Sequence, residues 1–179
     1  MDVIDNIRFS LDAEQIMTQT HVEAGSSDAE ELGTLIELAK EVGKPKAAYA
    51  ACFITGRDGN TVHIDDVRFS SRTLAHNLEP VQRVFPLVAT CGHELDEAFP
   101  GKADILQEFW WDVIKTHMLG AANKQLSDHL HRKFRLGKTA TMRPGSGDAS
   151  VWPIEQQKDL FALLGDVEGA VGVRLTDSF

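Results

Sequence analysis

The chain has 179 residues, 42% of them hydrophobic and 25% charged, so it is long enough to bury a core as one globular domain over residues 1–179. Its 27 acidic and 18 basic residues give a formal net charge of −9 without any block of Lys or Arg, which disfavours a nucleic-acid surface. No apolar run approaches the roughly 20 residues of a membrane span, and no basic-then-apolar leader begins the chain. Its two cysteines, Cys52 and Cys91, make neither a disulfide framework nor a CxxC metal motif, so we expect a cytoplasmic protein.

Two helices are predicted in the N-terminal quarter of the chain. Residues 3–10 are predicted as a short strand or an extended lead that ends at Ser10, whose hydroxyl can cap a helix over residues 11–21. A Ser-Ser-Asp cap at residues 26–28 begins a second helix that stops at Gly43. Acidic residues occupy the first turn of this second helix, where the helix dipole favours them.

Buried strands are predicted next. Residues 47–55 form a compact apolar run bounded by Pro45 and a Gly-Arg-Asp-Gly-Asn cluster. This pattern predicts a buried strand that turns tightly into a second strand over residues 61–69. Residues 84–90 repeat the buried-strand pattern, and residues 91–94 lead from it into a short helix.

A seven-residue pattern occurs twice. Residues 4–10 read IDNIRFS and residues 64–70 read IDDVRFS, and each copy is followed by apolar positions at helical spacing. Two copies are too few for a solenoid, in which at least three stacked repeats bury a core. The two copies are either equivalent strand-to-helix entries or a coincidence.

The longest periodic segment is residues 103–136, which predicts one long helix, or two helices broken near Gly120. Gly137 is the expected cap at its end, with basic residues in the last turn. The apolar positions near one broad face are Ile105, Leu106, Phe109, Val113, Met118, Ala121, Ala122, Leu126, Leu130 and Phe134. The rest of the chain predicts, in order, a strand, a helix begun by Pro153 and a final strand, over residues 139–142, 153–164 and 172–175.

The richest local chemistry lies in the loop before Pro153. Gly145 and Gly147 let backbone N–H groups approach a ligand closely, and Arg143 beside them can bind a carboxylate or phosphate through its planar fork. The same pattern also fits an ordinary strand-to-helix connection whose glycines only satisfy turn geometry. The loop completes neither GxGxxG nor GxxxxGK[ST], so nucleotide binding of those two kinds is not expected.

Cys91 lies between a predicted buried strand and a predicted helix. A thiol at a helix N-terminus can have a lowered pKa, whereas a small residue packed at a strand end is the alternative interpretation. The seven histidines include no HExxH motif and no pair four residues apart. We therefore expect no metal site.

Several stretches resemble a known family. Arg143-Pro144-Gly145-Ser146-Gly147, the Trp152-Pro153 pair with its following helix, and the final VRLTDSF look like the C-terminal part of the activation domain of vitamin B12-dependent methionine synthase. The likeness is closer still to free-standing relatives that accompany corrinoid methyltransferases. The ATCGHEL stretch of residues 89–95 and Leu130-His131 resemble other parts of the family.

The resemblance implies an α+β fold, with a bent antiparallel sheet and flanking helices. It also implies that the protein binds S-adenosylmethionine and supports methylation or reactivation of a cobalamin carried by a partner, either a corrinoid protein or a methyltransferase. No residue is implied as a catalytic acid or base, and no nucleic-acid or membrane partner is implied. The family's cofactor-binding positions are matched here by Arg143, Pro144, Gly145 and Ser146. The predicted cofactor-binding loop also includes Gly147 and Asp148, with Cys91 and Lys124 as secondary positions.

The sequence departs from the family pattern R-x-x-P-G-Y. Arg143 is adjacent to Pro144, Ser146 replaces the tyrosine, and Lys124 stands where the family has a carboxylate, which reverses the sign of that contact. We expect the domain to lack the family's C-terminal segment. Two hypotheses follow: an S-adenosylmethionine-binding part of a cobalamin-dependent methyltransferase system, or a cofactor-free module that docks on a corrinoid protein or methyltransferase and shifts its conformation.

Overall fold

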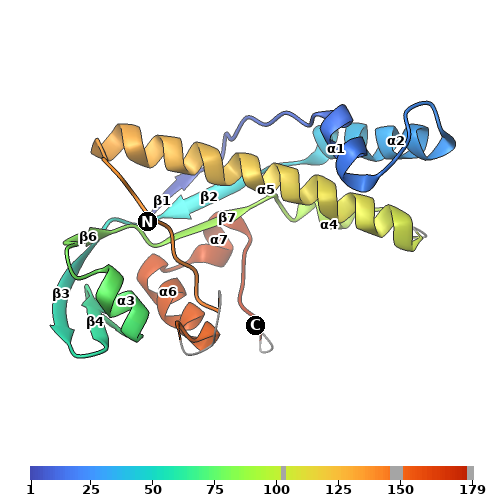
Figure 1. Cartoon of the computed structure of the whole chain (residues 1–179). Coiled ribbons are helices and arrows are strands. Elements are labelled where there is room, and N and C mark those ends of the chain that lie inside the picture. The colour runs from blue at the N-terminus through green and yellow to red at the C-terminus, as the bar shows by residue number, and fades with distance from the viewer. Residues whose placement is uncertain (102–103, 146–150, 177–179) are drawn as a thin grey trace. The chain divides into compact units, whose positions relative to one another are not determined.

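The computed structural model describes residues 1–101, 104–145 and 151–176 (Figure 1). The fold is α+β, as the sequence predicts, with an antiparallel sheet and flanking helices. The chain divides into two compact units. The hairpin unit comprises residues 1–3, 48–88 and 136–179, and the helical unit comprises residues 4–47 and 89–135.

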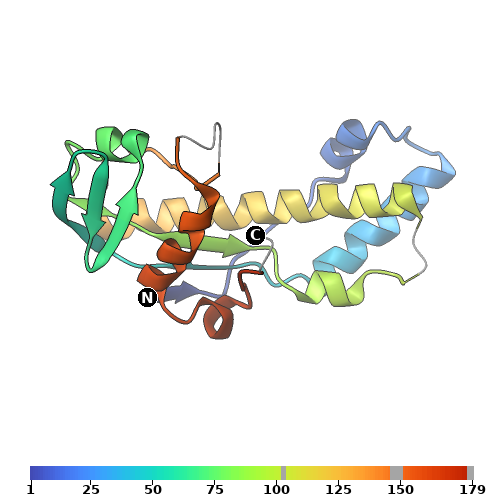
Figure 2. The ribbon, with the colours of Figure 1, turned by 90° about the horizontal axis from the view of Figure 1, so that it is seen from below.

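The helical unit is built from α1 (Ala13–Thr20), α2 (Ser27–Val42), α4 (Glu94–Ala98) and α5 (Ile105–Phe134). Figure 2 shows α1, α2 and α4 gathered around the first half of α5. Two tryptophans of α5, Trp110 and Trp111, are buried in the shared core. The rings of Trp111 and Phe99 stack with their centroids 5.3 Å apart, and the Trp111 indole N–H donates to the Leu95 carbonyl at 3.2 Å. The fully buried members of this core include Ile16, Leu32, Ile36, Leu95, Trp110, Ile114 and Met118.

The ends of the helices test the predicted caps. The predicted cap and end of α2 are confirmed. The Ser26 hydroxyl accepts from the Ala29 N–H at 3.2 Å, and the helix stops before Gly43. The cap of α1 is Asp12, not Ser10, since the Asp12 carboxylate lies in reach of the Gln15 N–H at 3.1 Å.

The long helix α5 is continuous through Gly120, so the unbroken alternative is confirmed. It begins with a reciprocal capping box between Asp104 and Gln107. It ends at Arg135, which takes the left-handed conformation at φ 51°, two residues before the predicted Gly137 cap.

The predicted apolar face of α5 is only partly correct. Val113, Met118, Ala122, Leu126 and Leu130 are buried as expected. The first buried residues of α5 on this face are Trp110 and Ile114, which lie one helical turn apart. The first turn of α5 precedes Trp110 and therefore lies outside the core. Three residues predicted to face the core are therefore exposed: Ile105 at 85%, Leu106 at 45% and Phe109 at 49%.

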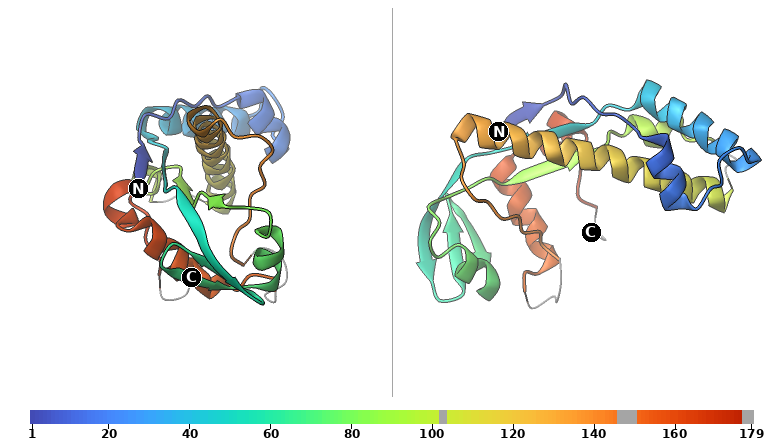
Figure 3. Two further views of the ribbon diagram at one scale, coloured as in Figure 1. Left: turned by 90° about the vertical axis from the view of Figure 1, so that its left-hand side faces the viewer. Right: turned by 45° about the horizontal axis from the view of Figure 1, so that its top comes forward.

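The hairpin unit contains a four-stranded antiparallel sheet in the order β5-β4-β3-β6. Its strands are β3 (Cys52–Asp58), β4 (Thr61–Ile64), β5 (Val67–Ser70) and β6 (Arg83–Val84). The predicted hairpin turn is confirmed, because β3 and β4 pair across a two-residue Gly-Asn turn with Asp58 opposite Thr61. The single strand predicted over residues 61–69 is wrong, because the chain turns at Asp65 and returns as β5. A register shift between Ile54 and Gly56 bends β3, and the sheet curls (Figure 3).

A second sheet has the strand order β1-β2-β7, formed by β1 (Asp2–Ile4), β2 (Lys46–Tyr49) and β7 (Leu87–Thr90). The two buried strands predicted over residues 47–55 and 84–90 are each split between the two sheets. Pro86 explains one break, because it lacks the N–H that a continuous ladder needs. Its carbonyl accepts from Ala50, the residue at which the other strand breaks, at 3.0 Å.

Short helices complete the hairpin unit: α3 (Arg72–Asn77), the 3-10 turn η1 (Ile154–Gln156), α6 (Gln157–Leu164) and α7 (Val167–Val171). The predicted helix after Pro153 is confirmed as η1 and α6. The strands predicted over residues 139–142 and 172–175 are wrong, since neither segment is paired. α7 was not predicted, because it is five residues long with a glycine inside and carries almost no helical periodicity. Among the described residues, no helix is both long and apolar enough to cross a membrane.

Candidate functional site

The Arg-Pro-Gly loop of the hairpin unit makes a tight turn at Gly145. This residue has φ 75°, and an added Cβ would lie 3.0 Å from the Ile154 side chain, so the turn requires glycine. Its N–H donates to the Trp152 carbonyl at 2.9 Å. The loop therefore uses the Gly145 N–H to close on itself, so this N–H is not one of the backbone groups open to a ligand.

The loop is attached to the core of the hairpin unit at both ends. Trp152 is 5% exposed and meets Phe69 edge-on at 6.1 Å between ring centroids, and Met142 packs against the same cluster. The hydroxyl of Ser71, which also caps α3, donates to the Val151 carbonyl. Arg143 is exposed and stands directly after this anchored methionine.

The remaining residues predicted for the cofactor loop, Ser146, Gly147 and Asp148, lie outside the described residues. Pro144 and Gly145 form the described part of the turn with Arg143. The structure therefore brings together three of the six predicted loop positions on one anchored turn.

Neither cysteine has the properties of a reactive thiolate. α4 begins at Glu94, so Cys91 precedes the helix by three residues, and burial raises the pKa of its thiol. The interpretation of Cys91 as a low-pKa thiol is wrong, and its packing against the helical core favours the alternative. Burial, together with a hydrogen bond to Asp65 and the charge of that carboxylate, raises the pKa of Cys52 to about 12.

Lys124 is exposed on α5, and its Nζ lies 2.9 Å from a carboxylate oxygen of Asp128. This hydrogen bond, reinforced by the lysine charge, lowers the pKa of Asp128. Lys115 is the α5 lysine whose charge acts on Cys91. Lys124 lies nine residues further along the helix, or about 13 Å at the rise of an α-helix. The two secondary positions, Cys91 and Lys124, therefore do not form one group.

A partly buried carboxylate at the start of α4 is a feature that the sequence did not indicate. The Glu94 side chain is 17% exposed and lies 3.7 Å from Lys46, 3.9 Å from Lys44 and 3.7 Å from His93. Burial alone would raise its pKa, but a backbone hydrogen bond and the charges of Lys46, His93 and Lys44 outweigh burial and lower it. One of its oxygens, Oε2, is buried without a hydrogen-bond partner among the described residues.

A polar hollow of about 500 Å³ lies on the helical unit and is lined by two segments, residues 5–8 and residues 43–46. Two of its lining residues are Lys44 and Lys46, the lysines that attract Glu94. The full lining is Asp5, Asn6, Ile7, Arg8, Gly43, Lys44, Pro45 and Lys46. Sequence reasoning missed this hollow because its two segments are more than thirty residues apart; the Lys-Pro-Lys run at residues 44–46 was the available signal.

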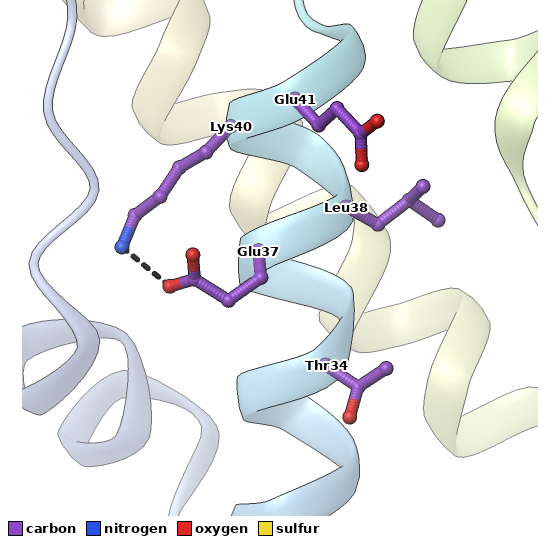
Figure 4. A pocket seen from close by; sticks show the side chains of 5 residues that line it. All are labelled: Thr34, Glu37, Leu38, Lys40 and Glu41. Carbon is purple, nitrogen blue, oxygen red and sulfur yellow. Dashed lines mark hydrogen bonds and ion pairs between the residues drawn. The ribbon is translucent and has the colours of Figure 1, made fainter.

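A second hollow, of about 590 Å³, runs along α2. Figure 4 shows that its side chains all come from one helix and that Glu37 and Lys40 bind each other, at 2.7 Å. Side chains on one helix face that satisfy each other do not converge on a ligand. This second hollow is therefore an open surface groove rather than a binding site.

Within the described ranges, no group of three or more His, Cys, Asp or Glu side chains is arranged to hold a metal ion. The geometry thus offers two places for a ligand: the anchored loop at Arg143 in the hairpin unit, and the cationic hollow in the helical unit. Comparison with protein-family models gives no match for this chain, and comparison with curated proteins gives none either.

Proposed function

We propose that the chain is a relative of the activation domain of vitamin B12-dependent methionine synthase that acts in the cytoplasm. It binds S-adenosylmethionine through the Arg-Pro-Gly loop and supports remethylation of a corrinoid carried by a partner methyltransferase. S-adenosylmethionine supplies the activated methyl group on its sulfonium. The protein supplies binding and orientation, which is a proximity effect.

The observation that supports this proposal most directly is the anchored turn at Gly145. Its hydrogen bond to the Trp152 carbonyl fixes the backbone beside Arg143, and Trp152 is seated in the core. An arginine on a fixed backbone loses less entropy when it binds a carboxylate than one on a loose loop. Arg143 would hold the carboxylate of the methionine part of the cofactor through its planar fork.

Calorimetry with S-adenosylmethionine tests the proposal. We expect saturable heat, and we expect Arg143→Ala to weaken binding by roughly 1.5 to 3 kcal/mol, the scale of a charged hydrogen bond. Arg68→Ala is the matched control, because Arg68 is an exposed arginine of the same unit on β5. Absence of heat at millimolar ligand contradicts the proposal, and an equal loss in both variants removes Arg143 from the site.

A second function, a cofactor-free docking module, is favoured by the exposed apolar first turn of α5. Ile105 and Phe109 are one turn apart and are 85% and 49% exposed, with Leu106 beside them. Exposed apolar side chains grouped on one helix are typical of an interaction surface. The proposed partner is a corrinoid protein or methyltransferase.

The docking function is tested with a purified corrinoid protein of the methyltransferase system. The wild-type chain is expected to co-elute with that protein and to alter its cobalamin absorption spectrum, whereas Ile105→Asn with Phe109→Asn does neither. The far-ultraviolet circular dichroism of the same double variant is the control for its folding. Co-elution that survives the double variant would assign docking to another surface.

A further inference from the structure

We propose that the cationic hollow of the helical unit is a binding site for the phosphate group of a small molecule. The hollow is lined by two segments, residues 5–8 and 43–46, and it shares no residue with the Arg-Pro-Gly loop. The proposal therefore stands or fails independently of S-adenosylmethionine binding.

Charge is the first reason for the proposal. The chain as a whole carries 27 acidic and 18 basic residues, yet the hollow is lined by three cations, Arg8, Lys44 and Lys46. They outnumber the two carboxylates near them, Asp5 in the lining and Glu94 beside the two lysines. A concave surface with an excess of one charge concentrates its field and attracts the opposite ion. In an acidic protein, this lining selects for an anion.

The first segment holds Arg8 on a fixed backbone. The side-chain amide of Gln125 on α5 accepts from the Arg8 N–H at 3.3 Å and donates to the Arg8 carbonyl. Ile7, the preceding residue, is buried at 7% exposure. The arginine side chain thus leaves a backbone that two hydrogen bonds and a buried neighbour keep in place.

The second segment also has a backbone fixed by packing. Gly43 packs so closely on α5 that an added Cβ would collide with the Met118 side chain. Lys44 abuts Gly92 through its carbonyl, 2.8 Å from the position of a Cβ there. Pro45 between the lysines is buried. The backbone of this side of the hollow is therefore formed before any ligand arrives.

The Glu94 carboxylate attracts the ammonium groups of both lysines but accepts a hydrogen bond from neither. Its carboxylate oxygen lies 3.7 Å from the Lys46 Nζ and 3.9 Å from the Lys44 Nζ, beyond the length of a hydrogen bond. An ammonium group has three N–H donors. Both lysines therefore keep N–H groups that can bind an anion in the hollow, while Glu94 limits where their side chains point.

The number of cations indicates the kind of anion. A phosphate monoester presents three terminal oxygens in different directions, so it can accept from one arginine and two lysines at once, whereas a carboxylate has only two oxygens. The hollow, of about 500 Å³, has room for a phosphate group. The expected ligand is a small phosphate monoester.

NMR titration of the full chain in phosphate-free buffer tests this site. Inorganic phosphate and glycerol phosphate are the probes, and amide shift changes that saturate and are confined to residues 5–8, 43, 44 and 46 are expected. Arg8→Gln and Lys44→Gln are each expected to weaken binding roughly tenfold, the usual effect of losing a charge-assisted hydrogen bond. Both residues are exposed, so these variants keep the fold.

Two controls remove the same charge elsewhere. Arg68→Gln changes the arginine at the equivalent place in the second copy of the seven-residue pattern, and Lys40→Gln changes an exposed lysine of α2. Both controls, and Arg143→Ala, are expected to bind phosphate as the wild type does. Shifts that never saturate, or losses of the same size in the controls, overturn the site. Acetate that binds as tightly as phosphate overturns the phosphate assignment.

Discussion

The two copies of one sequence pattern, IDNIRFS at residues 4–10 and IDDVRFS at residues 64–70, take different structures. In the second copy, Ile64 ends β4, two residues turn the chain, and the last four form β5. In the first copy, only Ile4 belongs to a strand, and the other six residues follow an irregular path. Seven similar residues therefore do not decide between a hairpin and an irregular chain. The decision depends on whether a strand is available as a partner.

The aspartates of the two copies illustrate the difference. Asp65 takes the left-handed conformation at φ 48°, and its carboxylate accepts from the Phe53 N–H at 2.9 Å. Its carbonyl accepts from the Thr55 hydroxyl at 2.8 Å. The equivalent Asp5 is exposed and contacts only its neighbour Asn6, among the hydrogen bonds of the described residues. The turn exists in the copy where β3 supplies groups for Asp65 to bind.

One device is common to both copies. A glutamine side chain binds both the N–H and the carbonyl of one residue, as a neighbouring strand would. Gln125 binds Arg8 in this way, and Gln156 binds Ser70 with distances of 3.1 and 2.7 Å. Each copy therefore has its exposed backbone satisfied, by a helix in one unit and by a 3-10 turn in the other.

The phenylalanines give the largest expected contrast between the copies. Phe69 is fully buried against Trp152, so Phe69→Ala should lower the free energy of unfolding by about 3 to 5 kcal/mol. Phe9 is only partly buried, and Phe9→Ala should cost less, about 1 to 2 kcal/mol. Urea denaturation of the two variants measures both values. Equal losses would show that the two copies contribute alike to stability.

The aspartates give a smaller contrast. Asp65→Ala removes the acceptor of the Phe53 N–H and places alanine at a positive φ, so a loss of about 1 to 3 kcal/mol is expected. Asp5→Ala should change stability by less than about 0.5 kcal/mol, because its side chain is exposed.

A second readout of Asp65→Ala is the Cys52 thiol. Its pKa of about 12 depends on burial first and on Asp65 next, so the pKa should fall in this variant and stay unchanged in Asp5→Ala. Thiolate absorbance against pH measures it. A Cys52 pKa that does not move would show that burial alone sets it.

The glutamines give the smallest contrast in stability but separate the copies by function. Gln156→Ala and Gln125→Ala should each cost about 1 kcal/mol, the net value of ordinary hydrogen bonds. Only Gln125→Ala should also weaken phosphate binding, because it releases the backbone of Arg8. Titration with inorganic phosphate checks this. Equal phosphate affinity in both variants would separate the glutamine contact from the binding site.

Local patterns were reliable where the local chain decides. The period of apolar residues in α2, its Ser26 cap and the stop at Gly43 are all confirmed, because helix hydrogen bonds join residues four apart. The Gly-Asn turn between β3 and β4 was equally readable. Predicted strands at residues 139–142 and 172–175 were wrong, because a short apolar segment pairs only if another strand lies beside it.

The candidate sites divide in the same way. Arg143, Pro144 and Gly145 are consecutive, so the sequence alone drew attention to their loop. Only the structure shows that the Gly145 N–H is engaged in a hydrogen bond to the Trp152 carbonyl. Glu94 and its two lysines are about fifty residues apart, and nothing local connects them. The sequence by itself determined the long helix, its neighbours and the loop's residue types, because these depend on near neighbours. The tertiary structure decided which strands pair, which thiol is buried and which charges meet in one hollow, because these depend on contacts between distant parts of the chain.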